Sequence, residues 1–330
     1  MQILVTGGGG FLGQAIVRRL IARGDRVRIL QRSDAPELVS LGVECLRGDI
    51  SDFSAVKRAA ANCQILFHVA AKAGVWGPFD DYYRANVVGT ENVINACHSQ
   101  GVRKLVYTSS PSVVFNGQNE TGIDESIPYP ARYLAHYPKT KAMAERLVVA
   151  ANRDGFATVS LRPHLIWGPG DNHLVPRLIQ RARAGQLRRV GDGTNIVDAT
   201  YIDNAADAHL QAANRLESGS AVAGKCYFIS NGEPLPLWDL INRMLACADL
   251  PPITRGISAT TAYLIGLMLE RCYALTGRSE EPRMTRFVAR QLSTSHWFCL
   301  DAARRDFGYE PKIGFEEGLR RLAASLKSTS

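Results

Sequence analysis

The feature that most restricts the fold is a glycine-rich run between a short apolar stretch and an amphipathic one. Residues 7–13 read Gly-Gly-Gly-Gly-Phe-Leu-Gly. Glycine lets the backbone turn tightly and approach a ligand closely, and the first turn of a following helix offers free N–H groups to an anion. A glycine run between a strand and a helix therefore predicts a dinucleotide pyrophosphate site. The residues expected to line it are Gly7, Gly10, Phe11, Leu12 and Gly13.

Short apolar runs alternate with helical stretches through the first half of the chain. Strands are expected over residues 3–6, 26–30, 43–47, 65–70, 104–109, 158–162 and 225–230, and helices over residues 11–23, 54–62, 87–100, 137–152 and 175–184. This alternation predicts an α/β fold with a Rossmann-type doubly wound parallel sheet. We expect a cofactor-binding domain over residues 1–165, with returning pieces near 196–230. A smaller, mainly helical substrate lobe is expected over residues 166–330.

Composition and charge narrow the class of protein. The 330 residues are 46% hydrophobic, and no stretch approaches the length of a membrane-spanning helix. The seven cysteines form no Cys-x-x-Cys pair, so neither a disulfide framework nor a metal site is predicted. The net charge of +8 comes from scattered basic residues without an aromatic-basic module for nucleic acid. The first residues lack the features of a signal peptide, so we expect a cytoplasmic protein that does not bind nucleic acid.

The end of the second predicted strand bears on the choice of dinucleotide. An acidic residue there would bind the free 2′-hydroxyl of NAD. This chain instead has Arg32 and Ser33, and the next acid is Asp34. A guanidinium can hold a 2′-phosphate through two N–H groups, and a serine can hydrogen-bond to it. We therefore predict a preference for NADP(H) over NAD, with an ordinary surface arginine as the alternative.

Two further strand ends are expected to reach the same cofactor. Asp49 and Ile50 follow the third strand, where a carboxylate could face the adenine amino group. Ala70 and Ala71 end the fourth strand, and their small side chains would let the backbone approach the cofactor. His68, just before them, is expected to be a structural histidine of the core.

The candidate catalytic pair is Tyr137 and Lys141, which stand four residues apart at the start of a predicted helix and so share a face. Reduction of a ketone needs a hydride and a proton, and a free tyrosine with a pKa near 10 is a poor acid or base at neutral pH. A neighbouring ammonium and the charge of an oxidised nicotinamide would lower that pKa. Lys141 would also bind the nicotinamide ribose. Of the adjacent Ser109 and Ser110, only one can face the substrate, and Ser110 is favoured as the holder of its oxygen.

Four motifs together resemble the extended short-chain dehydrogenases. They are the glycine run, Tyr-Thr-Ser-Ser over residues 107–110, Tyr-x-x-x-Lys over residues 137–141 and Leu-Arg-Pro over residues 161–163. Within that group the chain resembles the 3β-hydroxysteroid dehydrogenase-like family over essentially its whole length. The resemblance implies that Ser110, Tyr137 and Lys141 are catalytic and that Pro163 covers the nicotinamide. It also implies a homodimer paired through the helices at 87–100 and 137–152, and assembly with other enzymes of its pathway.

The second lobe bears on the substrate. Residues 260–269 are densely apolar, and three interpretations compete: ordinary core, a cap over an apolar substrate channel, or contact with a membrane surface. We expect an apolar small-molecule substrate. Three charged or titratable side chains could approach the pocket mouth, although side chains of this kind are more often structural. One of the three, Lys72, would attract a carboxylate. The three are Lys72, His164 and His173.

The predicted activity is the NADPH-dependent reduction of a ketone to a secondary alcohol, and the resemblance implies, most specifically, reduction of a 2-alkyl-3-oxoalkanoate to its 3-hydroxy acid. The alternatives are a 3β-hydroxysteroid dehydrogenase and a nucleotide-sugar epimerase. From a different class, the chain could be a dinucleotide-binding sensor or scaffold. The complete set of Ser110, Tyr137 and Lys141 argues against a sensor, which needs no proton donor.

Overall fold

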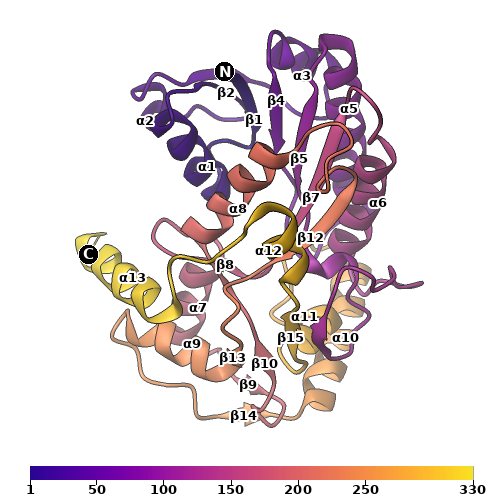
Figure 1. Cartoon of the computed structure of the whole chain (residues 1–330). Coiled ribbons are helices and arrows are strands. Elements are labelled where there is room, and N and C mark those ends of the chain that lie inside the picture. The colour runs from indigo at the N-terminus through magenta and orange to yellow at the C-terminus, as the bar shows by residue number, and fades with distance from the viewer. Residues whose placement is uncertain (330) are drawn as a thin grey trace.

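The computed structural model describes residues 1–329 and is built around a seven-stranded sheet whose neighbouring strands are all parallel (Figure 1). The predicted doubly wound sheet is confirmed. Its strands, in spatial order, are β12 (Lys225–Ile229), β7 (Ala157–Pro163), β5 (Lys104–Thr108), β4 (Ile65–His68), β1 (Gln2–Thr6), β2 (Arg26–Gln31) and β3 (Glu44–Arg47).

Helices cover both faces of this sheet because alternate strand residues point to opposite sides. Ile3 and Val5 pack in the core beneath α1 (Phe11–Ala22) and α8 (Ile202–Arg215). Leu4 packs in a second core with the helices on the other face. These are α3 (Phe53–Ala60), α5 (Gly89–Gln100) and α6 (His136–Ala150).

The strand order reverses between β1 and β4, and this reversal places the future site. From β1 the chain proceeds outward to β2 and β3, and then returns to β4 on the other side of β1. In open α/β sheets the loops beyond such a switch point diverge and leave a crevice at the carboxyl ends of the strands. The glycine run follows β1 and the two alanines follow β4, so both flank this crevice.

Most predicted elements match the observed ones to within two residues at each end, and two of the differences affect the cavity. The helix expected over residues 87–100 begins earlier, with α4 (Phe79–Tyr82), and continues through a π-helical turn, η1 (Tyr83–Val88), into α5. The π-helical turn carries Asn86, whose amide bonds to both the N–H and the carbonyl of Lys72, at 2.8 and 3.1 Å. The strand expected to reach residue 70 ends at His68, because Ala70 turns toward the glycine run and its N–H meets the Thr6 hydroxyl.

A smaller sheet and a set of helices form the rest of the molecule. The sheet pairs β13 (Leu235–Pro236), β10 (Ile196–Val197), β15 (His296–Phe298) and β6 (Glu120–Ile123). Short strand pairs join β11 (Thr200–Tyr201) to β8 (Ile166–Trp167) and β14 (Gly256–Ile257) to β9 (Arg189–Val190). The remaining helices are α2 (Pro36–Val39), η2 (Pro111–Val113), α7 (Leu174–Arg183), α9 (Leu237–Ala246), α10 (Ala259–Thr276), α11 (Arg286–Gln291), α12 (Asp301–Phe307) and α13 (Phe315–Thr329).

The apolar segment at residues 260–269 forms the first half of α10 and is not ordinary core. Within the helix only Ala262 and Gly266 are buried, while Leu264 and Met268 are 55 and 64% exposed. The core interpretation of this segment was therefore wrong, because most of its apolar side chains are exposed or only half-buried. Across residues 1–329, no helix combines the length and apolarity needed to cross a bilayer.

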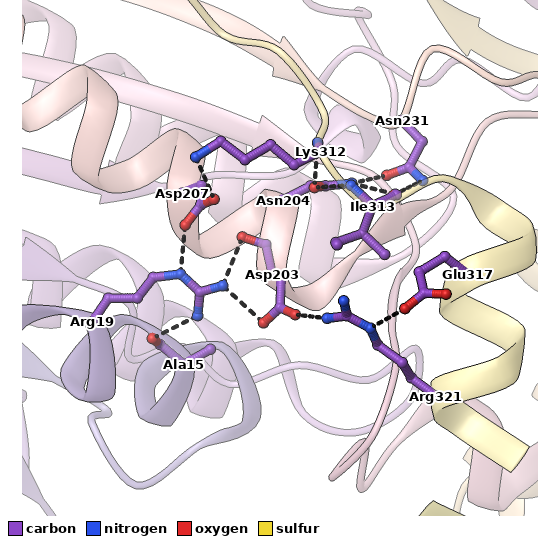
Figure 2. Close-up of polar contacts among 10 residues, drawn as sticks. All are labelled: Ala15, Arg19, Asp203, Asn204, Asp207, Asn231, Lys312, Ile313, Glu317 and Arg321. Atoms are coloured by element: carbon purple, nitrogen blue, oxygen red, sulfur yellow. Dashed lines mark hydrogen bonds and ion pairs between the residues drawn. The ribbon is translucent and has the colours of Figure 1, made fainter. Parts of the chain in front are cut away.

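A charged cluster ties the first helix to the carboxyl-terminal part of the chain (Figure 2). Arg19 of α1 donates to Asp207 at 2.5 Å and to Asp203 at 2.8 Å, both on α8. Arg321 of α13 donates to the other oxygen of Asp203 at 3.2 Å and to Glu317 within its own helix at 2.7 Å. The helix that begins at the glycine run is thus fixed to α8, and through it to α13.

Candidate active site

A cavity of about 930 Å³ opens at the carboxyl ends of the strands, at the switch point of the sheet. It brings together residues from the glycine run, from the ends of β2 to β5 and from the start of α6. All of the site residues predicted from the sequence line it: Gly7, Gly10, Phe11, Leu12, Gly13, Arg32, Ser33, Asp49, Ile50, Ala70, Ala71, Ser110, Tyr137, Lys141 and Pro163.

The glycine run forms a cradle that side chains would fill. Gly7 has a φ of +68°, in the left-handed region that favours glycine. A Cβ atom on Gly13 would lie 2.1 Å from the Gly7 carbonyl oxygen, which is backbone and cannot swing away. The helix then begins at the N-cap residue Gly10 without a side-chain cap and without an acidic residue in its first turn. The N-terminus of α1 therefore fits a bound pyrophosphate.

The cavity rim at Arg32 and Ser33 is held by a residue that sequence reasoning missed. The Gln31 side chain accepts a hydrogen bond from the Gly9 N–H at 2.6 Å and donates to the Ser33 carbonyl at 2.7 Å. This bridge fixes the glycine run relative to Arg32 and Ser33, both of which are exposed at the cavity rim. At the end of β2, the sequence reasoning considered only an acid for the ribose hydroxyl or a basic residue for a 2′-phosphate. Gln31 was missed because a glutamine that bonds to nearby backbone leaves no periodic pattern in the sequence.

Asp49 lies in a positively charged corner of the same end. Partial burial opposes its ionisation, but hydrogen bonds from Ser51 and the charges of Arg32 and Arg84 lower its pKa overall. Arg84 also lines the cavity and was missed, because it lies in the π-helical turn that the sequence did not reveal. A carboxylate that stays ionised is suited to accept hydrogen bonds from an adenine or ribose.

At the opposite end, α6 presents Tyr137 and Lys141 on one face. Lys141 is only 2% exposed, and its Nζ donates to the Thr108 carbonyl at 2.6 Å while lying 4.2 Å from the centre of the Tyr107 ring. Burial lowers the pKa of this amine to about 7, against the opposing charge of Glu145. The amine thus changes charge near neutral pH.

Tyr137 departs from one expectation. Burial raises the pKa of its hydroxyl, and a hydrogen bond with Ser110 only partly opposes the shift. The expected lowering by the ammonium of Lys141 is not seen, because that group is directed at the Thr108 carbonyl and the Tyr107 ring. A tyrosine with a raised pKa keeps its proton at neutral pH and is an acid rather than a base.

The two adjacent serines differ in their surroundings. The Ser110 hydroxyl hydrogen-bonds to Tyr137 and lies 2.9 Å from the Ser112 hydroxyl. Ser109 is buried, its N–H donates to the Leu161 carbonyl at 2.6 Å, and its hydroxyl finds no hydrogen-bond partner among the described residues. The contact with Tyr137 favours Ser110 as the serine that faces a substrate.

The histidines and Lys72 separate into structural and cavity-lining groups. His68 is buried between the hydroxyls of Thr6 and Thr90, at 2.8 and 3.0 Å, which confirms its structural role. His164 is also buried, lies outside the cavity lining and bonds to the Asp198 carbonyl at 2.7 Å. Lys72 and His173 do line the cavity.

Lys72 directly follows Ala70 and Ala71 in the sequence, and all three line the cavity. Its Nζ lies 3.2 Å from Asp81, and both side chains are partly exposed. An ion pair in this setting is worth little, so a substrate carboxylate could displace Asp81 at small cost. Among residues 1–329, no three His, Cys, Asp or Glu side chains gather closely enough to hold a metal ion.

Comparison with known families and curated proteins identifies relatives that cover nearly the whole chain. The sequence profile of the 3-beta hydroxysteroid dehydrogenase/isomerase family matches residues 4–253. A 2-alkyl-3-oxoalkanoate reductase of Stenotrophomonas maltophilia is 55% identical over 328 residues, covering 98% of this chain and 99% of that protein. The decarboxylating sterol-4-alpha-carboxylate 3-dehydrogenase of Mus musculus is 33% identical over 330 residues, covering 98% of this chain and 90% of that protein.

Solved structures share the fold over the full chain. The crystal structure of gox2253 is 27% identical, with a TM-score of 0.80 and coverage of 99% of this chain and 98% of the other. MoeE5 in complex with UDP-glucose and NAD is 25% identical, with a TM-score of 0.76 and coverage of 100 and 99%.

Proposed function

Because the chain belongs to the 3-beta hydroxysteroid dehydrogenase/isomerase family, we propose that this oxidoreductase uses NADPH to reduce a 2-alkyl-3-oxoalkanoate to the 3-hydroxy acid. The observation that carries the proposal is the meeting of Ser110, Tyr137 and Lys141 in the cavity that the glycine cradle enters. An acid, a hydrogen-bonding hydroxyl and a buried amine beside a dinucleotide site are the groups that ketone reduction requires.

Each residue of the site has a proposed part in the reaction. The nicotinamide, when bound, supplies the hydride. The backbone of Gly7, Gly10 and Gly13 receives the pyrophosphate, with Phe11 and Leu12 in the same turn. Tyr137 gives its proton to the carbonyl oxygen, which Ser110 orients by a hydrogen bond. The Lys141 amine, which is directed at the Thr108 carbonyl, would bind the nicotinamide ribose and hold it beside Tyr137.

The remaining cofactor contacts are proposals of the same kind. Asp49 and Ile50 would contact the adenine, while Ala70, Ala71 and Pro163 would let the nicotinamide ribose and ring lie close to the backbone. The raised pKa keeps Tyr137 protonated at neutral pH, so this residue can donate the proton that reduction of a ketone requires.

Arg32 and Ser33 support the choice of NADPH. Both lie exposed at the rim of the cavity, where a guanidinium can meet a phosphate from solvent without losing a partner inside the chain. MoeE5, a structural relative, is in complex with NAD, so dependence on a nicotinamide dinucleotide is shared and the 2′-phosphate preference rests on Arg32.

The substrate class follows from the names of two relatives taken together. Both names describe a carboxylate attached to the carbon next to the reacting carbon, once on an alkanoate and once on a sterol. Lys72 in the cavity lining provides a cation for that carboxylate. At 55% identity over the full length, the alkanoate is the better match than the sterol.

We also propose how the chain divides into cofactor-binding and substrate-binding parts, and how two copies associate. We assign cofactor binding mainly to residues 1–165 with returning pieces near 196–230, and substrate binding mainly to residues 166–330. A homodimer would pair α5 and α6 with their copies, as the family resemblance implies, and would leave room for assembly with other enzymes of the pathway.

The test is NADPH oxidation by the purified protein with a 2-alkyl-3-oxo acid, beside a 3-ketosteroid and a nucleotide sugar. Turnover of the keto acid alone is the expected result. Turnover of the steroid alone would replace the substrate class, and turnover of the nucleotide sugar would favour the epimerase alternative. Tight NADPH binding with no turnover of any of the three would contradict the assignment as a reductase.

A further inference from the structure

Helix α8 carries a buried histidine that contacts the end of the strand leading to Ser110. His209 is inaccessible to solvent, and its Nε2 lies 2.9 Å from the Thr108 hydroxyl oxygen. Its Nδ1 lies 2.7 Å from the carbonyl oxygen of Ala205, one turn earlier on α8. His209 does not line the cavity, so any influence that it has on the reaction passes through Thr108.

The surroundings of the His209 ring determine which groups donate. Burial lowers the pKa of His209 to about 4, so the ring is neutral at neutral pH and carries a single N–H group. The Ala205 carbonyl can only accept, so that N–H group is on Nδ1 and donates to it. Nε2 is then an acceptor, and the Thr108 hydroxyl donates to it. The hydroxyl of Thr108 is therefore committed to α8, although Thr108 itself lines the cavity.

The same threonine holds the proposed catalytic amine from the other face of the sheet. The Thr108 hydroxyl meets α8 on one face, whereas Lys141 comes from α6 on the opposite face. The Thr108 carbonyl accepts from the Lys141 Nζ at 2.6 Å. Because the hydroxyl and the carbonyl belong to one residue at the end of β5, a rotation of Thr108 that broke the contact with His209 would also move the acceptor of the amine.

Helix α8 is itself held in place, which makes His209 a fixed reference point (Figure 2). The two aspartates of the charged cluster bind the arginine of α1. Between them in the sequence, the Asn204 carbonyl oxygen accepts from the backbone N–H groups of Lys312 and Ile313, at 2.9 and 3.1 Å. These contacts lie within the two turns before His209. Since α1 begins at the glycine run, α8 joins the cofactor cradle to the strand end that holds the amine.

Three other groups lie near the Lys141 amine. The Tyr107 ring lies 4.2 Å from Nζ and presents its face. Glu145 is one turn later on α6, but its two carboxylate oxygens accept from Arg162 at 2.7 and 3.0 Å. Burial lowers the pKa of His68 to about 3, and both of its ring nitrogens meet threonine hydroxyls. The contact with the Thr108 carbonyl is therefore the one that a change at His209 would alter.

We propose that His209 is a positioning residue: it binds the Thr108 hydroxyl on one face of the sheet and so fixes the Thr108 carbonyl against the Lys141 amine on the other. A group held in advance needs no rearrangement when the cofactor binds. An acceptor at this place also favours the ammonium, since a hydrogen bond to the charged form favours that form. The effect on turnover rests on the proposed function, whereas the effect on the titration of Lys141 does not.

The experiment follows the titration of Lys141 by NMR, in the full chain with lysine labelled with carbon-13 at Cε. The signal is assigned by its absence from a Lys141→Arg variant. The test variants are His209→Leu, which removes the acceptor, and Thr108→Val, which removes the hydroxyl and keeps the carbonyl. His209→Gln is the conservative variant, because its amide oxygen can accept the same hydrogen bond. The matched control is Thr158→Val, which removes another buried threonine hydroxyl, bonded to the Val148 carbonyl at 2.8 Å.

We expect the titration midpoint of Lys141 to move about 0.5–1 pH unit lower in each test variant, and no further when the two are combined. For the keto acid, kcat/KM should then fall about two- to five-fold at about pH 7 and recover near about pH 5.5, where the ammonium form returns. His209→Gln and Thr158→Val should keep the parent titration.

An unchanged titration in Thr108→Val would overturn the proposal even where His209→Leu fails to fold. The same shift in the Thr158→Val control would also overturn it, because the effect would then be a general result of a lost buried hydroxyl. A shifted titration in a protein that turns over no keto acid would support the role of His209 and reject the proposed function.

Discussion

The Nζ atom of Lys141 lies 2.6 Å from the carbonyl oxygen of Thr108, at the end of the strand that leads to Ser110. This contact holds a buried amine whose pKa falls to about 7, mainly through desolvation. The charged form therefore exists below pH 7 and is lost as the pH rises through that value.

The first prediction is a pH dependence of ketone reduction. Since the ammonium form of Lys141 supports the reaction, kcat/KM should fall above about pH 7, and Tyr137 should not titrate in this range because its pKa is raised. The measurement is kcat/KM against pH with the keto acid. A Lys141→Arg variant, which keeps its charge at all these pH values, should be slower but lack the decline. A decline that begins only near pH 10 would contradict this assignment.

The second prediction separates Ser110 from Ser109. Loss of one hydrogen-bond donor to a developing oxyanion typically lowers kcat by about 10²–10³-fold. Ser110→Ala should show a loss of this size, because the Ser110 hydroxyl contacts Tyr137. Ser109→Ala removes a hydroxyl that has no partner in the described chain, so it serves as the matched control with nearly unchanged kcat. The reverse order of effects would transfer the role to Ser109.

The third prediction concerns the 2′-phosphate of the cofactor. Arg32→Ala should weaken NADPH binding by roughly 10- to 150-fold, the equivalent of about 1.5–3 kcal/mol for lost charge-assisted hydrogen bonds. NADH binding should be unchanged. Fluorescence titration of both cofactors measures the effect. Arg47→Ala is the control, since Arg47 is 68% exposed on the neighbouring strand but does not line the cavity. Equal weakening of NADH binding would mean that Arg32 does not contact the 2′ position.

The fourth prediction tests carboxylate recognition by Lys72. Lys72→Gln should raise KM for a 2-alkyl-3-oxo acid about five-fold, because a partly exposed charge pair of this strength is worth on the order of 1 kcal/mol. A ketone of the same chain without the carboxylate should be unaffected. Lys139→Gln, which removes an exposed amine that lies 4.8 Å from the centre of the Phe79 ring, is the control. If NADPH binding weakens instead, Lys72 serves the cofactor.

The fifth prediction concerns stability. Arg19→Ala removes charge-assisted hydrogen bonds to Asp203 and Asp207, so the free energy of unfolding should fall by about 1.5–3 kcal/mol in urea titrations. Arg18→Ala on the same helix removes only a pair with Glu37 at 3.6 Å and should stay within about 0.5 kcal/mol of the parent. Similar losses in both variants would show that the cluster of Figure 2 adds nothing specific.

The sequence predicted the cofactor half well because its signals are local. Most of the parallel strands contain a short apolar run, and the residues of the glycine run and of the Tyr-x-x-x-Lys pair lie close together in the sequence. Arg84 was missed because a π-helical turn has no signature in the spacing of apolar residues. Gln31 was missed because its role depends on the backbone of Gly9, which is distant in sequence.

The second half of the chain was predicted less well, because its strand pairing is not encoded in local sequence patterns. Its small sheet pairs two-residue strands with segments from widely separated parts of the chain, such as β10 with β15. Such pairing depends on contacts that form only after the chain has collapsed. The face of α8 against the sheet is built mostly from alanines, such as Ala205, Ala208 and Ala212, which a search for large apolar residues passes over.

The place of β12 at one edge of the large sheet has a consequence for biosynthesis. Six of the seven strands lie before residue 164, and the last of these in the sequence is β7. All residues of β7 are buried in the folded protein, where its outer edge pairs with β12 at residues 225–229. While the chain emerges from the ribosome, β7 is an open edge for about sixty further residues. A nascent chain at that stage offers unpaired backbone to any other strand, and chaperones that cover such edges would act in this interval.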